Sequence, residues 1–204
     1  MKIKAIAFLV LLLAVWAGTP QTLSGGEAYI FASDIIKSLD SFYRGEKHIY
    51  EKYQEGKTYA KIEEIEHDIN IYRKGLANAI LLVKPYLNHK IQPIRFMAQK
   101  ITSSYQQGLN LFDLVSDQML KKPNEVKFIT ILDYEKALKE IAANVTVTIM
   151  ALIERDMLSK NQINALKDQL VKTFGDTIKV EPKEKTLNSV LAAHGFWWAL
   201  TKER

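Results

Sequence analysis

The chain contains no cysteine among its 204 residues, and this absence excludes several kinds of chemistry. A protein without thiols has no thiolate nucleophile, no dithiol redox pair and no zinc or iron–sulfur site held by cysteine. It also has no disulfide bonds, so an exported chain of this composition depends on packing for its stability. The sequence therefore points away from disulfide-stapled scaffolds and from cysteine enzymes.

Charge of one sign is not concentrated along the chain, although the formal net charge is +5. Basic and acidic residues alternate, as in Lys61, Glu63 and Glu64, and this alternation is typical of solvated helix faces. No basic stripe interleaved with aromatic residues is present. We therefore expect no nucleic-acid partner.

Only the beginning of the sequence has a long uncharged apolar run. Lys2 and Lys4 precede residues 5–17 (AIAFLVLLLAVWA), and Pro20 follows them, which is the pattern of a secretory signal peptide. As a helix this run would span roughly 20 Å, less than the ~30 Å hydrocarbon core of a bilayer. We predict that residues 1–17 are a cleaved signal peptide and that the mature protein is periplasmic or extracellular. An uncleaved anchor is the alternative.

Four later segments repeat apolar residues at the heptad spacing of helices that pack against helices. Short connections around Gly56, Pro93 and Pro123 favour antiparallel neighbours. The sequence thus predicts an all-α fold, namely an antiparallel bundle of four long helices plus two shorter C-terminal helices. The predicted bundle domain covers residues 25–174, and the segments begin near Ala28, Ile62, Ile94 and Tyr134.

The chain changes character after the bundle segments. Residues 175–185 lack a helical period and contain Pro182, so we interpret them as a linker. Residues 186–202 form a last apolar and aromatic helix, which either packs on the bundle or docks a partner. The candidate partner-binding residues are Leu191, His194, Phe196, Trp197 and Trp198.

Glu46 stands at an apolar seam position between Phe42 and Ile49. A buried carboxylate is costly unless it is paired, so this position requires an explanation. Either Gly45 turns the helix locally and Glu46 reaches water, or Glu46 forms a polar spot inside the bundle that binds a small ligand or a cation.

Several tyrosines also fall on the apolar seams. They either line a ligand pocket or cap the ends of the bundle with the ring buried and the hydroxyl in water. The candidate ligand-binding residues are Glu46, Tyr53, Tyr72 and Tyr105.

Signals for catalysis or metal binding are weak. Glu64 and His67 form one Glu-x-x-His spacing, whereas di-iron bundles need two such motifs and two further glutamates. Because Ile65 and Ile69 mark the buried side of the predicted helix, Glu64 and His67 should point sideways or outward. The 4 histidines lie far apart in sequence, and no serine has the surroundings of a nucleophile. We expect no catalytic residue, no metal and no cofactor, and hence no enzyme.

Residues 158–162 read Leu-Ser-Lys-Asn-Gln, which resembles the Leu-Thr-x-x-Gln signature of the small periplasmic stress chaperones related to Spy and CpxP. The resemblance is confined to this stretch, has serine for threonine, and implies an envelope stress chaperone. The same residues also fit a capping box, with Ser159 as the N-cap and Gln162 three residues later. The motif thus predicts, on structural grounds alone, that a helix begins here.

These observations together favour a non-catalytic binding or scaffolding module of the cell envelope, whose partner we expect to be another envelope protein. A small-ligand carrier or sensor with a pocket between the helices is one alternative, and an envelope stress chaperone is the other. Contact with a membrane would come from the C-terminal helix or from an uncleaved leader.

Overall fold

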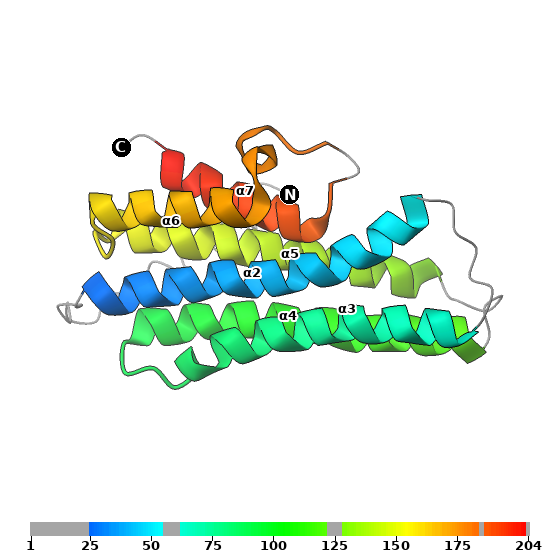
Figure 1. The fold of residues 1–204 in the computed structure, drawn as a ribbon. Helices are drawn as coiled ribbons and strands as arrows, with labels where there is room; N and C mark the ends of the chain where they lie inside the picture. The colour runs from blue at the N-terminus through cyan, green and yellow to red at the C-terminus, as the bar shows by residue number, and fades with distance from the viewer. Residues whose placement is uncertain (1–24, 55–61, 122–127, 184–185, 203–204) are drawn as a thin grey trace.

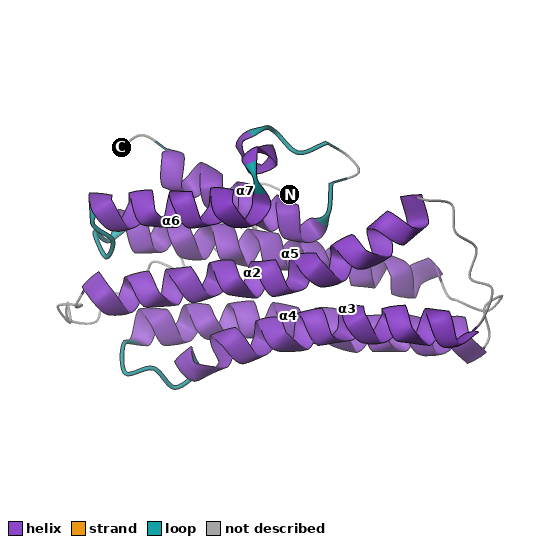
Figure 2. Ribbon diagram, in the orientation of Figure 1, coloured by secondary structure: helices purple, strands orange, loops and turns teal. Residues whose placement is uncertain are grey.

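The computed structural model describes residues 25–54, 62–121, 128–183 and 186–202. All regular secondary structure within these ranges is helical, so the predicted all-α fold class is confirmed (Figure 2). The predicted signal peptide, residues 1–17, lies outside the described residues.

Four long helices form the body of the molecule, and they correspond to the four heptad segments. Consecutive long helices run antiparallel and pack side by side (Figure 1). A short 3₁₀ helix, η1 (Lys84–Tyr86), with Pro85 inside it, follows the second of them. The long helices are α2 (Gly25–Gln54), α3 (Ile62–Val83), α4 (Gln92–Lys121) and α5 (Phe128–Glu154).

Three shorter elements follow the long helices: α6 (Lys160–Phe174), the 3₁₀ helix η3 (Asp176–Lys179) and α7 (Asn188–Thr201). The two predicted C-terminal helices are therefore both present. The segment that we interpreted as a linker contains η3, whose Ile178 is completely buried. Residues 180–183 have no helical structure.

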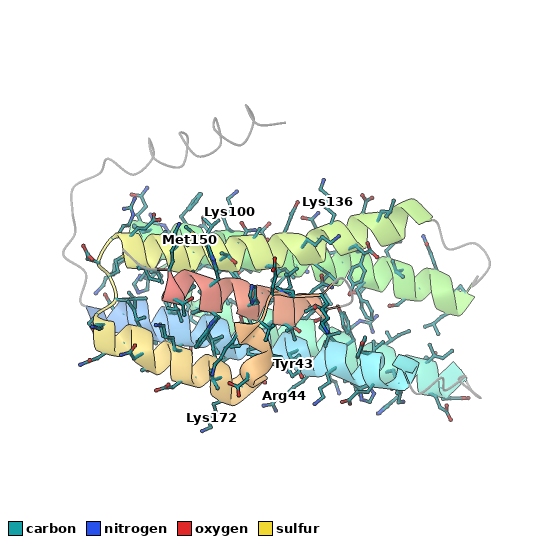
Figure 3. The ribbon with its side chains drawn as sticks, turned by 90° about the horizontal axis from the view of Figure 1, so that it is seen from above. Tyr43, Arg44, Lys100, Lys136, Met150 and Lys172 are labelled. Carbon is teal, nitrogen blue, oxygen red and sulfur yellow. The ribbon has the colours of Figure 1, made fainter. Side chains whose placement is uncertain are left out.

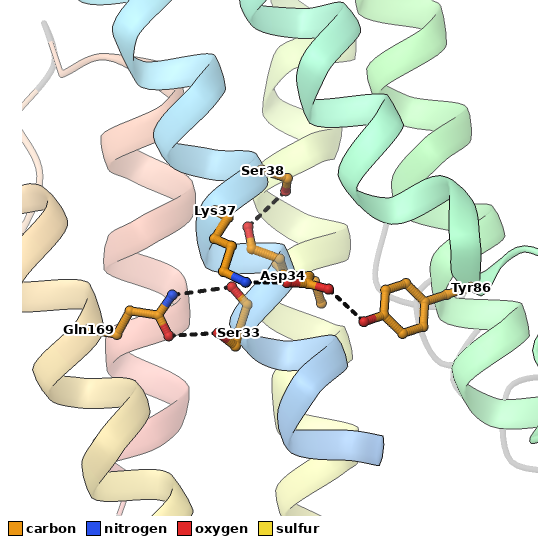
Figure 4. Close-up of polar contacts among 7 residues, drawn as sticks. Ser33, Asp34, Lys37, Ser38, Tyr86 and Gln169 are labelled. Carbon is orange, nitrogen blue, oxygen red and sulfur yellow. Dashed lines mark hydrogen bonds and ion pairs between the residues drawn. The ribbon is translucent and has the colours of Figure 1, made fainter. Parts of the chain in front are cut away.

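Helix α2 is fixed to its neighbours by polar contacts on two sides (Figure 4). On one side, the amide of Gln169 in α6 accepts a hydrogen bond from Ser33 Oγ at 3.0 Å and donates one to the Ser33 carbonyl at 3.3 Å. On the other side, the Tyr86 hydroxyl donates to Asp34 Oδ2 at 2.6 Å. These contacts set the positions of α6 and of η1 against α2.

Helices α2 and α3 approach each other closely where two glycines meet. A Cβ atom on Gly75 would lie 2.9 Å from the Ser41 carbonyl oxygen, and one on Gly45 would lie 3.2 Å from the Cα atom of Tyr72. Helix α2 continues through Gly45 without a break. The glycine at this position therefore permits close backbone packing.

The arrangement differs from a closed ring of four helices because α7 lies between α2 and α5 (Figure 3). Helix α7 packs along α5 and also contacts α2 and α6, whereas α2 and α5 barely contact each other. Gly195 of α7 is pressed against Thr146 of α5, since a Cβ atom on Gly195 would lie 2.1 Å from Thr146 Oγ1. Four of the buried residues of α7 have small side chains, and two have large ones. The small ones are Ser189, Ala192, Ala193 and Ala199, and the large ones are Phe196 and Leu200.

Candidate functional site

The carboxylate of Glu46 lies at the first turn of α7, and the residue is 6% exposed. Its Oε2 accepts hydrogen bonds from the Ser189 backbone N–H at 2.8 Å and from Ser189 Oγ at 2.6 Å. Its Oε1 accepts from the Asn188 backbone N–H at 3.3 Å and from Asn188 Nδ2 at 3.2 Å. The interpretation in which Gly45 turns this side chain to water is therefore wrong.

Glu46 replaces the N-cap residue that α7 lacks. Leu187, which precedes the helix, offers no side-chain hydrogen bond to the first turn. The first N–H groups of a helix need acceptors, and a negative charge is favoured there by the helix dipole. A residue of α2 thus supplies the cap of a helix that is more than a hundred residues further along the chain.

Burial sets the electrostatics of this carboxylate. Loss of solvent raises the pKa of Glu46 above its ordinary value of 4.5, and the hydrogen bonds from Ser189 and Asn188 oppose this rise only in part. Proton uptake by Glu46 is therefore easier in the folded protein than in the unfolded chain.

Three tyrosines, one from each of α3, α4 and α5, lie near the charge of Glu46: Tyr72 and Tyr105 are buried, and Tyr134 is partly buried. Burial is the main cause that raises the pKa of Tyr72, Tyr105 and Tyr134, and the Glu46 carboxylate raises each pKa further. The hydroxyls of Tyr72 and Tyr134 are hydrogen-bonded to each other. The Tyr105 hydroxyl lies 3.2 Å from Ser38 Oγ. Tyr72 and Tyr105 thus have their hydroxyls in the interior rather than in water.

The structure brings together three of the four candidate ligand-binding residues, namely Glu46, Tyr72 and Tyr105. The side chain of Tyr53 lies outside the described part of the chain. Sequence reasoning missed Tyr134 as a polar contributor because it lies on the broad apolar face of the fourth segment. The signal that could have found it is its hydroxyl, since a tyrosine on an apolar face needs a hydrogen-bond partner there.

The candidate partner-binding residues of α7 divide between core and surface. Phe196 is completely buried, and it is therefore a core residue rather than part of an exposed face. His194 is partly buried, with Nδ1 2.8 Å from the carbonyl oxygen of Ile178, and Leu191 is likewise partly buried. Trp198 is 46% exposed, which leaves the largest aromatic surface of α7 in water.

Lysine side chains lie over both tryptophan rings. Lys202 Nζ is 5.1 Å from the centroid of the Trp198 ring, and Lys179 Nζ of η3 is 5.6 Å from the centroid of the partly buried Trp197 ring. Such cation–π contacts hold the rings in defined orientations. The outer side of α7 thus combines aromatic surface with positive charge.

A second polar cluster, which sequence reasoning missed, joins α2 to α3. Asp68 is 2% exposed, and its carboxylate lies 2.7 Å from His48 Nε2 and 2.8 Å from Lys52 Nζ. His67, of the Glu-x-x-His spacing, is exposed, as is Glu64. Within the described ranges no group of three or more His, Asp or Glu residues is arranged to hold a metal ion.

The predicted capping box at the start of α6 is confirmed. Ser159 Oγ accepts from the Gln162 backbone N–H at 3.3 Å, and Gln162 Oε1 accepts from the Ser159 backbone N–H at 2.8 Å. Gln162 Nε2 also donates to the Gly25 carbonyl oxygen at 2.8 Å, which ties α6 to the start of α2. A structural role therefore accounts for both residues of the short motif.

Comparison of the chain with protein-family models, with curated proteins and with solved structures gives no significant match. Among the described residues, no helix combines the length and the apolar character that a membrane crossing requires.

Proposed function

We propose that this protein is an exported, non-catalytic helical bundle that binds another protein of the cell envelope through the outer face of α7. The observation that carries this proposal is the 46% exposure of Trp198 on a helix that is built into the bundle. Tryptophan is enriched among the residues that dominate protein–protein binding energies. The charge pattern of residues 1–20 supports export.

The surroundings of Trp198 support the same interpretation. The ring is attached to a helix that packs on α5, α2 and α6, so it is presented by a packed support rather than by a loop. Partly exposed Trp197 and Leu191 lie on the same helix, and Met150 of α5 lies alongside its C-terminal half (Figure 3). A preorganised aromatic surface loses little conformational entropy when a partner covers it.

A photo-reactive amino acid at position 198 tests this proposal in cells that express the chain. The matched control position is Leu81 of α3, which is 58% exposed and lies on a different helix. We expect a discrete cross-linked adduct with an envelope polypeptide from position 198 and none from position 81. No adduct at position 198, or the same adducts from both positions, would contradict the proposal.

A small-ligand carrier is the second candidate, and the polar interior formed by Glu46, Tyr72 and Tyr105 favours it. A ligand at Glu46 would have to displace the donors of Asn188 and Ser189, which already occupy the carboxylate. Native mass spectrometry of the protein taken from its own envelope separates the two candidates. Extra mass of a few hundred daltons or less on each subunit would support a carrier, whereas bare subunits or complexes with other polypeptides would support the binding module.

A further inference from the structure

The surface around Trp198 lies on two adjacent helices that both have a long stretch without charged residues. Residues 141–153 of α5 and residues 186–201, which include all of α7, contain no Asp, Glu, Lys or Arg. The two helices pack side by side (Figure 3). Charged residues are depleted at the centres of protein–protein interfaces, whereas aromatic residues and methionine are enriched there. The composition therefore extends the binding face around Trp198 from α7 onto α5.

The side chains at this surface follow helical spacing on both helices. Each helix contributes three residues at positions i, i+4 and i+7, which lie along one side of a helix. Val147 of α5 is 51% exposed and Trp198 of α7 is 46% exposed, and the other four residues are exposed or partly buried. The α5–α7 face, as we call it, consists of Ala143, Val147, Met150, Leu191, Gly195 and Trp198.

The contact between Gly195 and Thr146 aligns the two rows of side chains. A Cβ atom on Gly195 would lie 2.1 Å from Thr146 Oγ1, so α5 and α7 approach each other closely there. Val147 follows Thr146 in α5, and Trp198 lies about one turn beyond Gly195 in α7. Because Gly195 has no side chain, the face stays low between Leu191 and Trp198. Two rows of side chains at helical spacing with a low centre suit the packing of a further helix.

Charges of both signs border the α5–α7 face. On α5, Lys139 and Glu140 precede it and Glu154 follows it. On α7, Lys202 follows it, with Nζ 5.1 Å from the centroid of the Trp198 ring. An anionic bilayer attracts a surface on which basic residues predominate. The mixed border instead complements a protein segment that has charges of both signs beside an apolar stripe.

We propose that the envelope partner contacts this protein through one amphipathic helix, which lies along the α5–α7 face. The apolar stripe of this helix covers Val147, Met150 and Trp198, and its charged residues lie beside the border. Helices of this kind are anchored by apolar side chains about three, four and seven residues apart. The inference rests on the proposed function, because it names the kind of segment that binds the face around Trp198.

Photo-reactive amino acids at positions 147 and 198, one in each full-length chain, test this proposal in cells. The control position is Leu132, which is 42% exposed on α5 but precedes Lys139 and so lies outside the face. Mass spectrometry of the adducts locates the partner residues that have reacted. We expect positions 147 and 198 to react with one segment of the same polypeptide, at residues about three, four or seven apart. Position 132 should give no adduct with it.

Val147→Lys, in the chain with the photo-reactive residue at position 198, supplies a second measurement. The substitution places a charge beneath the partner helix and spares the core, because Val147 is largely exposed. We expect a loss of adduct at position 198 of about tenfold or more, and little change when Leu132→Lys replaces Val147→Lys. Thermal unfolding followed by circular dichroism checks that both variants keep the fold.

The outcomes separate this inference from the proposed function. An adduct with an envelope polypeptide from position 198 but none from position 147 would overturn the helical partner and leave the binding face at Trp198. An undiminished adduct in Val147→Lys would do the same, as would reaction at alternate residues of an extended segment. Lipid or a second copy of this chain as the sole adduct, or no adduct from position 198, would overturn both.

Discussion

At the scale of single residues, one carboxylate links the first and last described helices. Glu46 interrupts an apolar heptad, and the sequence alone left two explanations for it, exposure or a polar interior. The structure excludes exposure, because Glu46 is buried and its carboxylate is bonded to the start of a helix from the far end of the chain. Binding of a small ligand or a cation at Glu46 stays a prediction. Sequence spacing could show that Glu46 needed a partner, but it could not identify Asn188 and Ser189, because the contact depends on tertiary packing.

Glu46→Ala should lower the free energy of unfolding by about 2–4 kcal/mol, because it removes the carboxylate that caps α7. The substitution leaves the donors of buried Ser189 and partly buried Asn188 without this acceptor. Denaturant unfolding followed by circular dichroism measures the change. Glu51→Ala is the matched control on the same helix, since Glu51 is largely exposed and only forms an ion pair with Lys47. An equal effect of both substitutions would contradict the capping role.

The raised pKa of Glu46 predicts a pH dependence of stability with a definite sign. A group whose pKa is higher in the folded state stabilises the fold most below its unfolded value of about 4.5, and this contribution is lost as the pH rises through the folded value. The wild type should therefore gain stability relative to Glu46→Gln as the pH falls from neutral toward 4.5. In other words, the free energy of unfolding of the wild type minus that of Glu46→Gln should increase. Denaturant titrations over this range measure it, and a difference that stays constant or decreases would count against the assignment.

At the scale of elements, the heptad repeats predicted the four long helices, and the Ser159–Gln162 spacing predicted the start of α6. These features are local, since a periodic apolar stripe and a capping box both act within a few turns of helix. The repeats did not predict that α7 would separate α2 from α5. That outcome depends on small residues such as Ala192, Ala193 and Gly195, which carry little hydrophobic signal but permit close packing.

The close crossing of α2 and α3 gives a prediction about glycine. Gly75→Ala should destabilise the protein by about 1–3 kcal/mol, because the added Cβ atom meets the Ser41 carbonyl oxygen at 2.9 Å. Gly26→Ala, in α2 with no atom within 4 Å of the added Cβ, should be neutral or slightly stabilising through helix propensity. Thermal and denaturant unfolding measure both, and a stabilising Gly75→Ala would show that the helices do not approach so closely.

The two faces of α7 should respond differently to truncation. Phe196→Ala removes a completely buried ring and should cost about 3–5 kcal/mol of stability. Trp198→Ala should cost less, about 1–2 kcal/mol, because nearly half of its surface is already in water. Denaturant unfolding gives both values. A larger loss of stability for Trp198→Ala than for Phe196→Ala would contradict the assignment of Phe196 to the core and of Trp198 to the surface.

At the scale of the whole molecule, the bundle is completed by its C-terminal helix. Helix α7 lies between the first and fourth long helices. It is held there by the cap at Glu46, by the close fit of Gly195 against Thr146 and by its own buried Phe196. The same helix carries the exposed Trp198 that we propose as the binding face. Helix α7 therefore contributes both to the core and to the proposed binding face, and both roles require that α7 is docked on the bundle.

Hydrogen exchange of the α7 backbone amides, measured by mass spectrometry on the full chain, shows whether α7 is docked in the wild-type protein. We expect residues 189–201 to exchange much more slowly than residues 180–183, which precede the helix. We also expect Glu46→Ala to remove much of this protection while α3 and α4 keep theirs. Exchange in α7 of the wild-type chain as fast as in residues 180–183 would show that α7 is not part of the bundle.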